Sequence, residues 1–136
     1  GWERFAARPL PKSLKIECKT LVFDNFSRAC CNFDINLNFL RKLNRDVQTT
    51  RSVEIPGTGG FMLAERTEEH ERLFTPGVEA DYFSTDDELI EKCRYYLNEP
   101  ELRKSMSQAG LSRCIDSGYS NQSRIKTVFK KLGVLS

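Results

Sequence analysis

Two short apolar runs, separated by a polar loop and a glycine-rich bend, constrain this chain more than any other feature. The first run ends at Leu40 and the second spans residues 61–64, with the basic loop 41–51 and a short helical turn carrying Glu54 between them. An order of strand, loop, helix, glycine turn and strand is typical of a βαβ unit with two parallel strands. Ligands bind open parallel sheets at the carboxyl ends of the strands. We therefore expect the loop to carry the working site.

The rest of the chain continues this alternation and then closes with helices. Strands are expected at residues 14–18, 32–39, 61–64 and 78–83, and helices at 25–31, 68–74, 86–97, from Pro100 to before Gly118, and at 121–132. This order predicts a three-layer α/β fold with a mostly parallel sheet, as one Rossmann-like domain over residues 1–136. Four strands are few for such a sheet, and the chain starts on Gly1 without a methionine. We expect a domain that is incomplete at its N-terminus.

Side-chain periodicity predicts which faces are buried. Alternation within residues 32–39 places four apolar side chains on one face, which is expected to meet the core: Phe33, Ile35, Leu37 and Phe39. Helical spacing in the last helix predicts a buried stripe of Ile125, Val128, Phe129 and Leu132. His70 lies within the charged segment EEHERL and is expected to face solvent.

Charge and cysteine content argue against several classes of function. Lys and Arg number 21 against 19 Asp and Glu, so a broad nucleic-acid-binding face is not expected. Only the loop 41–51 is locally basic, with four basic residues and one acid, which suggests an anion site. Five cysteines without CxxC spacing and a single histidine argue against zinc and favour reduced thiols in a cytoplasmic protein. No apolar run approaches the roughly 18 residues of a membrane span.

Candidate binding residues cluster around this loop. Asp46 and Glu54 lie eight positions apart, where two carboxylates would accept hydrogen bonds from sugar hydroxyls, although both also suit an ordinary loop and helix. Thr50 and Arg51 are expected at the start of the short helix, where unpaired N–H groups and the helix dipole favour a phosphate. The alternative for Arg51 is a salt-bridged surface residue. Asn44, in the same loop, is a further candidate for substrate binding.

The glycines of the bend, Gly57, Gly59 and Gly60, permit a positive φ or a close backbone approach. The sequence GTGG matches neither the dinucleotide-binding fingerprint nor the P-loop, so neither function is assigned.

Several motifs together resemble the C-terminal part of GT-B glycosyltransferases, in the spore-maturation-protein-like branch (glycosyl transferases group 1). The first is R-x-x-E-I-P-x-x-G-G, from Arg51 to Gly60, and the second is L-F-x-x-G-x-E-A, from Leu73 to Ala80. The acidic DDELIEK helix and the pair formed by Arg103 and Gly110 are similar too. The likeness covers roughly residues 20–132.

This resemblance implies a Rossmann-like domain that binds a nucleoside-diphosphate sugar. In related retaining enzymes, two acidic residues eight positions apart lie beside the donor, and here they fall on Asp46 and Glu54. The second binds the ribose and the first lies near the transferred sugar, with Asp46 in place of the family's Glu. The family's glycine falls on Gly59, and Gly60 follows it. Arg51 and the helix start at Thr50 would neutralise the departing diphosphate, a role that needs no metal or other cofactor.

The N-terminal acceptor domain of such an enzyme and the first strand of its donor domain are expected to be missing. The chain alone is therefore expected to be inactive, and to transfer sugar to an acceptor only when joined to an acceptor domain. The alternative is a noncatalytic α/β interaction or assembly module derived from such a domain, which would pair with another copy through an exposed sheet edge. The nucleotide base, the sugar and the acceptor stay open.

Overall fold

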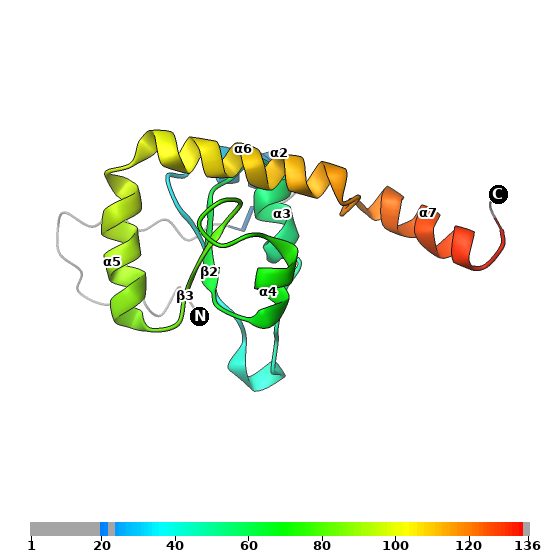
Figure 1. The fold of residues 1–136 in the computed structure, drawn as a ribbon, viewed down its shortest axis with the longest axis horizontal. Coiled ribbons are helices and arrows are strands. Elements are labelled where there is room, and N and C mark those ends of the chain that lie inside the picture. The colour runs from blue at the N-terminus through cyan, green and yellow to red at the C-terminus, as the bar shows by residue number, and fades with distance from the viewer. Residues whose placement is uncertain (1–19, 22–23, 135–136) are drawn as a thin grey trace.

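The computed structural model describes residues 20–21 and 24–134 (Figure 1). Three strands form a parallel sheet in the order β1 (Asn36–Asn38), β2 (Met62–Glu65) and β3 (Asp81–Phe83). The strands are shorter than predicted at residues 32–39 and 78–83, and the strand expected at 14–18 lies outside the described residues. The parallel order confirms the βαβ prediction, because each strand returns to the sheet through a helix.

The helices begin and end close to where the sequence predicts. They are α2 (Asp24–Asn32), α3 (Arg51–Gly57), α4 (Glu68–Leu73), α5 (Asp86–Leu97), α6 (Pro100–Asp116) and α7 (Asn121–Lys131), with a 3-10 turn at Lys42–Asn44. The side chains of Thr67, Thr85 and Ser120 each accept a hydrogen bond from the N–H three residues later, which caps α4, α5 and α7. Gly118 ends the α6 segment with a φ of 63°.

The two faces of the sheet carry separate apolar clusters. On one face Met62, Ala64 and Tyr82 pack with Cys30, Ile55, Phe74, Ala80 and Cys114. On the other face Phe61, Leu63 and Phe83 pack with Tyr96 and Met106. Helices therefore cover both faces and make three layers, as predicted. The long helix α6 reaches both clusters and crosses the sheet near the amino end of β3 (Figure 1).

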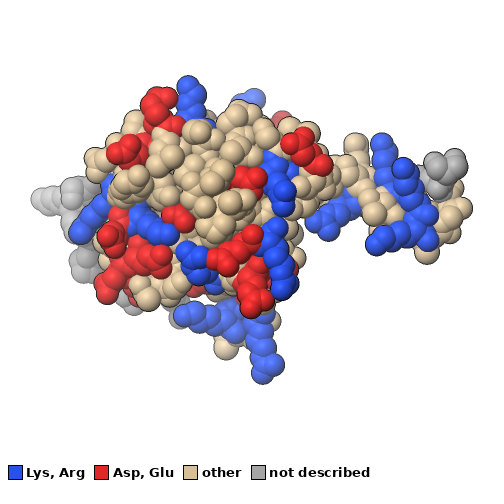
Figure 2. All heavy atoms as spheres, in the orientation of Figure 1, with Lys and Arg blue, Asp and Glu red and all other residues tan. Residues whose placement is uncertain are grey.

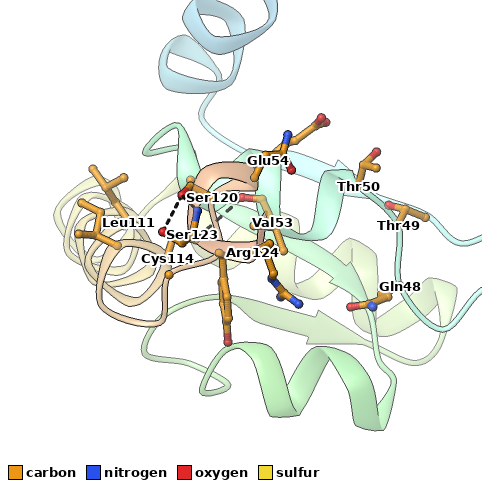
Figure 3. A pocket seen from close by; sticks show the side chains of 15 residues that line it. Gln48, Thr49, Thr50, Val53, Glu54, Leu111, Cys114, Ser120, Ser123 and Arg124 are labelled. Atoms are coloured by element: carbon orange, nitrogen blue, oxygen red, sulfur yellow. Dashed lines mark hydrogen bonds between the residues drawn. The ribbon is translucent and has the colours of Figure 1, made fainter. Parts of the chain in front are cut away.

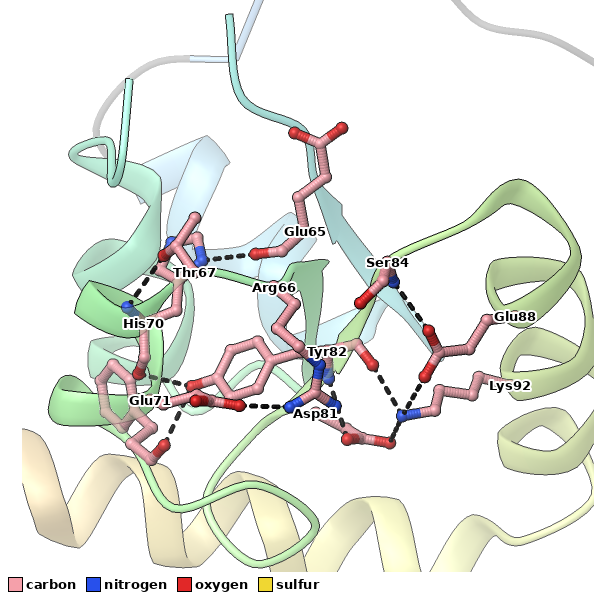
Figure 4. A network of polar contacts seen from close by, with 11 residues as sticks. Glu65, Arg66, Thr67, His70, Glu71, Asp81, Tyr82, Ser84, Glu88 and Lys92 are labelled. Carbon is pink, nitrogen blue, oxygen red and sulfur yellow. Dashed lines mark hydrogen bonds and ion pairs between the residues drawn. The ribbon is translucent and has the colours of Figure 1, made fainter. Parts of the chain in front are cut away.

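A largely buried ion pair between Lys92 and Asp81 links α5 to the sheet. Asp81 Oδ2 accepts a hydrogen bond of 2.8 Å from the Tyr96 hydroxyl. The same oxygen lies 2.9 Å from Lys92 Nζ (Figure 4). Lys92 Nζ also donates to the carbonyl oxygen of Tyr82 at 2.6 Å. Burial, together with the bond to Asp81, raises the pKa of the Tyr96 phenol. The charged groups are hydrogen-bonded to one another, which offsets the cost of removing them from water.

The prediction that the apolar face of β1 meets the core is wrong. Leu37 and Phe39 are 43% and 46% exposed, whereas Asn36 and Asn38 point inward and are 7% and 4% exposed. Asn36 Nδ2 donates to the carbonyl oxygens of Cys30 and Phe61, and Asn38 Nδ2 donates to Ser52 Oγ. The inner face of β1 meets backbone and hydroxyl groups rather than apolar side chains, so amides that satisfy these groups are favoured there.

The predicted buried stripe of α7 is also wrong. Ile125, Val128, Phe129 and Leu132 are 42–69% exposed, and no residue of α7 is buried in the described part of the chain. Figure 1 shows the reason, because α7 extends beyond the end of α6 and away from the sheet. The helix is amphipathic, as its sequence indicates, but its apolar side chains are exposed and belong to neither cluster.

Candidate functional site

The loop that follows β1 projects from the carboxyl edge of the sheet. It includes the 3-10 turn Lys42–Asn44, and Arg45 ends this turn in the left-handed region with a φ of 53°. Leu43 at its tip is fully exposed. Figure 2 shows Lys and Arg side chains on this projection and along α7. The basic loop predicted from the sequence therefore lies at the carboxyl end of the sheet, where parallel sheets bind ligands.

Arg51 and Glu54 form an ion pair in the first turn of α3. Arg51 Nη1 lies 2.8 Å from Glu54 Oε2, and the two side chains are 46% and 47% exposed. The Arg51 guanidinium also lies 3.9 Å above the centre of the Phe26 ring, which holds it over α2. Arg51 is thus a salt-bridged surface residue, as one of the two alternatives predicts. A single ion pair occupies only part of the five N–H donors of its guanidinium, so an anion can still bind.

The backbone N–H groups at the start of α3 have acceptors within the turn. Ser52 N–H donates to Thr49 O at 3.1 Å, and the N–H groups of Val53 and Glu54 both donate to Thr50 O. The prediction that unpaired N–H groups here bind a phosphate is therefore wrong for these three amides. The positive charge at this turn comes from the Arg51 side chain and from the N-terminal end of the short helix.

An open cleft of about 950 Å³ separates α3 from the corner between α6 and α7 (Figure 3). One wall is formed by Thr49, Thr50 and Glu54. The opposite wall and the floor are formed by Val53, Leu111, Cys114, Tyr119, Ser120, Ser123 and Arg124. Its volume falls within the roughly 300–1,000 Å³ of small-molecule sites. Hydroxyl groups, one carboxylate and one guanidinium around an apolar floor suit a polar ligand that also carries a flat ring.

The predicted site residues divide between this cleft and its surroundings. Thr50 and Glu54 line the cleft, and Arg51 lies next to them on the side of α3 that faces α2. Asp46 is half-buried and Asn44 is exposed; both belong to the projecting loop, and neither lines the cleft. Of the seven predicted residues, the structure therefore brings Thr50, Arg51 and Glu54 together, leaves Asp46 and Asn44 on the loop, and places Gly59 and Gly60 in the bend after α3.

Gly59 and Gly60 have a structural role within the protein. Gly59 has a φ of 82°, which favours glycine. A Cβ on Gly60 would lie 2.8 Å from the carbonyl oxygen of Cys30 and 2.9 Å from Asn36 Nδ2. The predicted positive φ and close approach are confirmed, and the groups approached at Gly60 belong to α2 and β1.

The sequence predicts that His70 faces solvent, and this prediction is wrong. Its side chain is fully buried, with Nε2 2.7 Å from Ser52 Oγ and Nδ1 2.6 Å from the carbonyl oxygen of Glu65. Burial lowers the pKa of His70. The sequence held a signal: His70 precedes Leu73 by three positions and Phe74 by four, and residues at these spacings share one face of a helix.

The cysteines in the described part of the chain are free thiols; Cys30 and Cys114 are buried, whereas Cys31 is exposed. Burial raises the pKa of Cys114 to about 11 and also raises the pKa of Cys30. Within residues 20–21 and 24–134, no three His, Cys, Asp or Glu side chains gather where they would hold a metal ion. In the same part of the chain, no helix combines the length and the apolar character needed to cross a membrane.

Comparison with known proteins identifies the family. A model of the glycosyl transferase-like family matches residues 11–130, a range that includes the three strands of the sheet, α3 and every residue that lines the cleft. Searches of curated proteins and of solved structures gave no match. The family match covers most of the chain and agrees with its parallel α/β fold. The chain therefore belongs to the glycosyl transferase-like family.

Proposed function

We propose that this chain binds the nucleotide of a nucleoside-diphosphate sugar in the cleft beside α3. Family membership supports a role in glycosyl transfer in general. The observation that carries the more specific proposal is the position of Glu54, which lines a cleft of about 950 Å³ and whose carboxylate is ion-paired to Arg51. Such a site offers a nucleotide both an acceptor for its hydroxyl groups and a cation for its phosphates.

Each residue has a role in this proposal. Glu54 accepts hydrogen bonds from the ribose hydroxyls. Arg51 and the Thr50 hydroxyl bind the diphosphate, and the guanidinium stabilises the negative charge that grows on it as the sugar departs. Asp46 and Asn44, on the projecting loop, are assigned to the sugar end of the donor. Gly59 and Gly60 shape the bend behind α3 and do not line the cleft, so they receive no contact with the ligand.

Transfer also needs an acceptor site. We propose that an N-terminal acceptor domain or a second copy of the chain supplies it, and that this chain alone has no transferase activity. We place the reaction in the cytoplasm, because free thiols such as Cys30 and Cys114 persist in a reducing compartment.

The test is a calorimetric and thermal-shift titration of the 136-residue chain with UDP, GDP, ADP and dTDP, without added metal. We expect saturable binding of one nucleotide, weakened about tenfold or more by Glu54→Gln and by Arg51→Ala. Glu91→Gln, an exposed acid on α5 outside the cleft, is the matched control and should bind like wild type. A cooperatively folded wild type that binds none of the four nucleotides would reject the proposal.

The second candidate function, a noncatalytic interaction module, is favoured by one observation. The apolar side of α7 is exposed at Ile125, Val128 and Phe129 and is flanked by Arg124 and Lys126. Such a helix suits docking to another chain. Sedimentation would show a dimer that Phe129→Asp dissociates, whereas a monomer over the micromolar range would exclude self-association.

A further inference from the structure

Ser52 and His70 form a buried hydrogen bond behind the cleft, not in it. Both side chains are fully buried, with 2.7 Å between Ser52 Oγ and His70 Nε2. His70 Nδ1 lies 2.6 Å from the carbonyl oxygen of Glu65, which can only accept. Nδ1 therefore carries the proton and Nε2 accepts from the Ser52 hydroxyl. The neutral form of the imidazole with hydrogen on Nδ1 is selected by the backbone of β2.

The remaining bonding capacity of Ser52 Oγ is used by the segment that leads into α3. Thr49 N–H donates to it at 3.0 Å and Asn38 Nδ2 donates at 3.2 Å. Thr49 Oγ1 in turn donates to Asn38 Oδ1 at 3.3 Å. A hydroxyl group can donate one hydrogen bond and accept two. All three positions of the Ser52 hydroxyl are therefore occupied, and these bonds fix the orientation of its side chain.

His70 is itself held in place by β3. The Tyr82 ring stacks on the imidazole, with ring centres 5.7 Å apart and planes 3° apart. The single O–H of Tyr82 is shared between two carbonyl oxygens at the end of α4, that of His70 at 2.7 Å and that of Phe74 at 3.0 Å (Figure 4). His70 is therefore a rigid anchor to which Ser52 is attached.

The residues attached to this anchor are those that line the cleft. Thr49 is bound directly to Ser52, and Thr50 and Glu54, at the N-cap and in the first turn of α3, line the cleft. We propose that Ser52 and His70 are positioning residues, which hold the turn 49–54 in the geometry that binds the nucleotide. The proposal rests on the proposed function, because it concerns the same cleft. An apolar pair would fill the same space, but it would not orient the turn through directed bonds.

The chemistry of the anchor provides conservative variants that separate positioning from packing. In His70→Gln, the amide oxygen extends far enough to replace Nε2 as the acceptor of the Ser52 hydroxyl. The shorter side chain of His70→Asn reaches only the position of Nδ1 and leaves Ser52 without its acceptor. Ser52→Ala removes the hydroxyl from the other side. Phe74→Leu, in the same buried cluster, is the control for lost packing alone, because Phe74 is fully buried and does not line the cleft.

The experiment measures amide hydrogen exchange over residues 48–54 and the affinity for UDP, GDP, ADP and dTDP on each folded variant. We expect Ser52→Ala and His70→Asn to speed exchange in this segment and weaken nucleotide binding about tenfold or more. His70→Gln should recover most of the affinity, and Phe74→Leu should keep it despite a lower melting temperature. Faster exchange with unchanged affinity, or equal losses in all four variants, would overturn the positioning role. Absence of binding by wild type would instead reject the proposed function, and the inference with it.

Discussion

Gly110 of α6 lies against the backbone of Glu79, so closely that a Cβ on Gly110 would be 2.6 Å from the carbonyl oxygen of Glu79. The same Cβ would lie 3.3 Å from Cβ of Pro56 at the end of α3. This contact brings α6 against both the segment that enters β3 and the helix that carries Glu54. The close approach explains why a residue without a side chain stands in the interior of a 17-residue helix.

Gly110→Ala should therefore lower the free energy of unfolding by about 1–3 kcal/mol, because a backbone oxygen cannot move aside as a flexible side chain does. Gly57→Ala is the matched control. Gly57 is the last residue of α3, and its Cβ would meet only Cys114 Sγ, at 3.9 Å. This variant should be neutral or stabilising by up to about 1 kcal/mol. Urea denaturation measures the free energy of unfolding of both variants. Equal stabilities of Gly110→Ala and Gly57→Ala would contradict the close contact at Gly110.

Two phenylalanines test the positions of α4 and α7. Phe74 is fully buried beneath the sheet, whereas Phe129 on α7 is 42% exposed. Phe74→Ala should cost about 3–5 kcal/mol through lost burial and a cavity, and Phe129→Ala should change stability by less than about 0.5 kcal/mol. Chemical denaturation of the monomeric wild type and of each variant measures the two changes in stability. A large loss in Phe129→Ala would mean that the apolar side of α7 is covered in solution.

Thiol reactivity should follow burial. Cys31 is exposed, whereas burial raises the pKa of Cys114 to about 11. At pH 8 only about one Cys114 side chain in a thousand would be a thiolate, the reactive form. In a Cys18→Ser background, iodoacetamide followed by mass spectrometry should therefore modify Cys31 first and leave Cys114 unmodified until the chain is denatured. Rapid labelling of Cys114 in the native protein would show that the floor of the cleft opens.

Stability should fall in mild acid because of His70. Burial lowers its pKa in the folded protein, so the unfolded chain binds the proton more readily. The stabilisation is complete above the ordinary histidine pKa of about 6.5 and is lost as the pH falls below it towards the folded value. The loss is at most about 1.4 kcal/mol per pH unit. Protonation would also place a second N–H opposite Ser52 Oγ, whose acceptor positions are taken by Thr49 and Asn38.

Denaturation curves between pH 7.5 and 5.5 measure this dependence. His70 is the only histidine of the chain, so His70→Gln serves as a control in which the dependence attributable to histidine is absent. Parallel pH profiles for wild type and His70→Gln would show that His70 does not titrate as its burial requires.

Sequence alone determined the order of the elements, the parallel α/β fold and the family. Local chemistry is enough for these: Thr67 and Thr85 cap their helices, and Gly59 takes the positive φ that a glycine permits. It also located Thr50, Arg51 and Glu54 in one turn, because residues close in sequence stay close in a helix.

Only the tertiary structure decided which faces are buried and what lies behind the site. Alternation assigns two faces to β1, but whether Leu37 or Asn38 meets the core depends on the groups that the neighbouring elements present there, which are carbonyl and hydroxyl oxygens. The stripe on α7 predicts an amphipathic helix, but its burial depends on whether another element lies opposite. The Ser52–His70 bond joins residues 18 positions apart on separate helices. Periodicity describes one element at a time, whereas burial and hydrogen bonding between elements depend on how those elements pack.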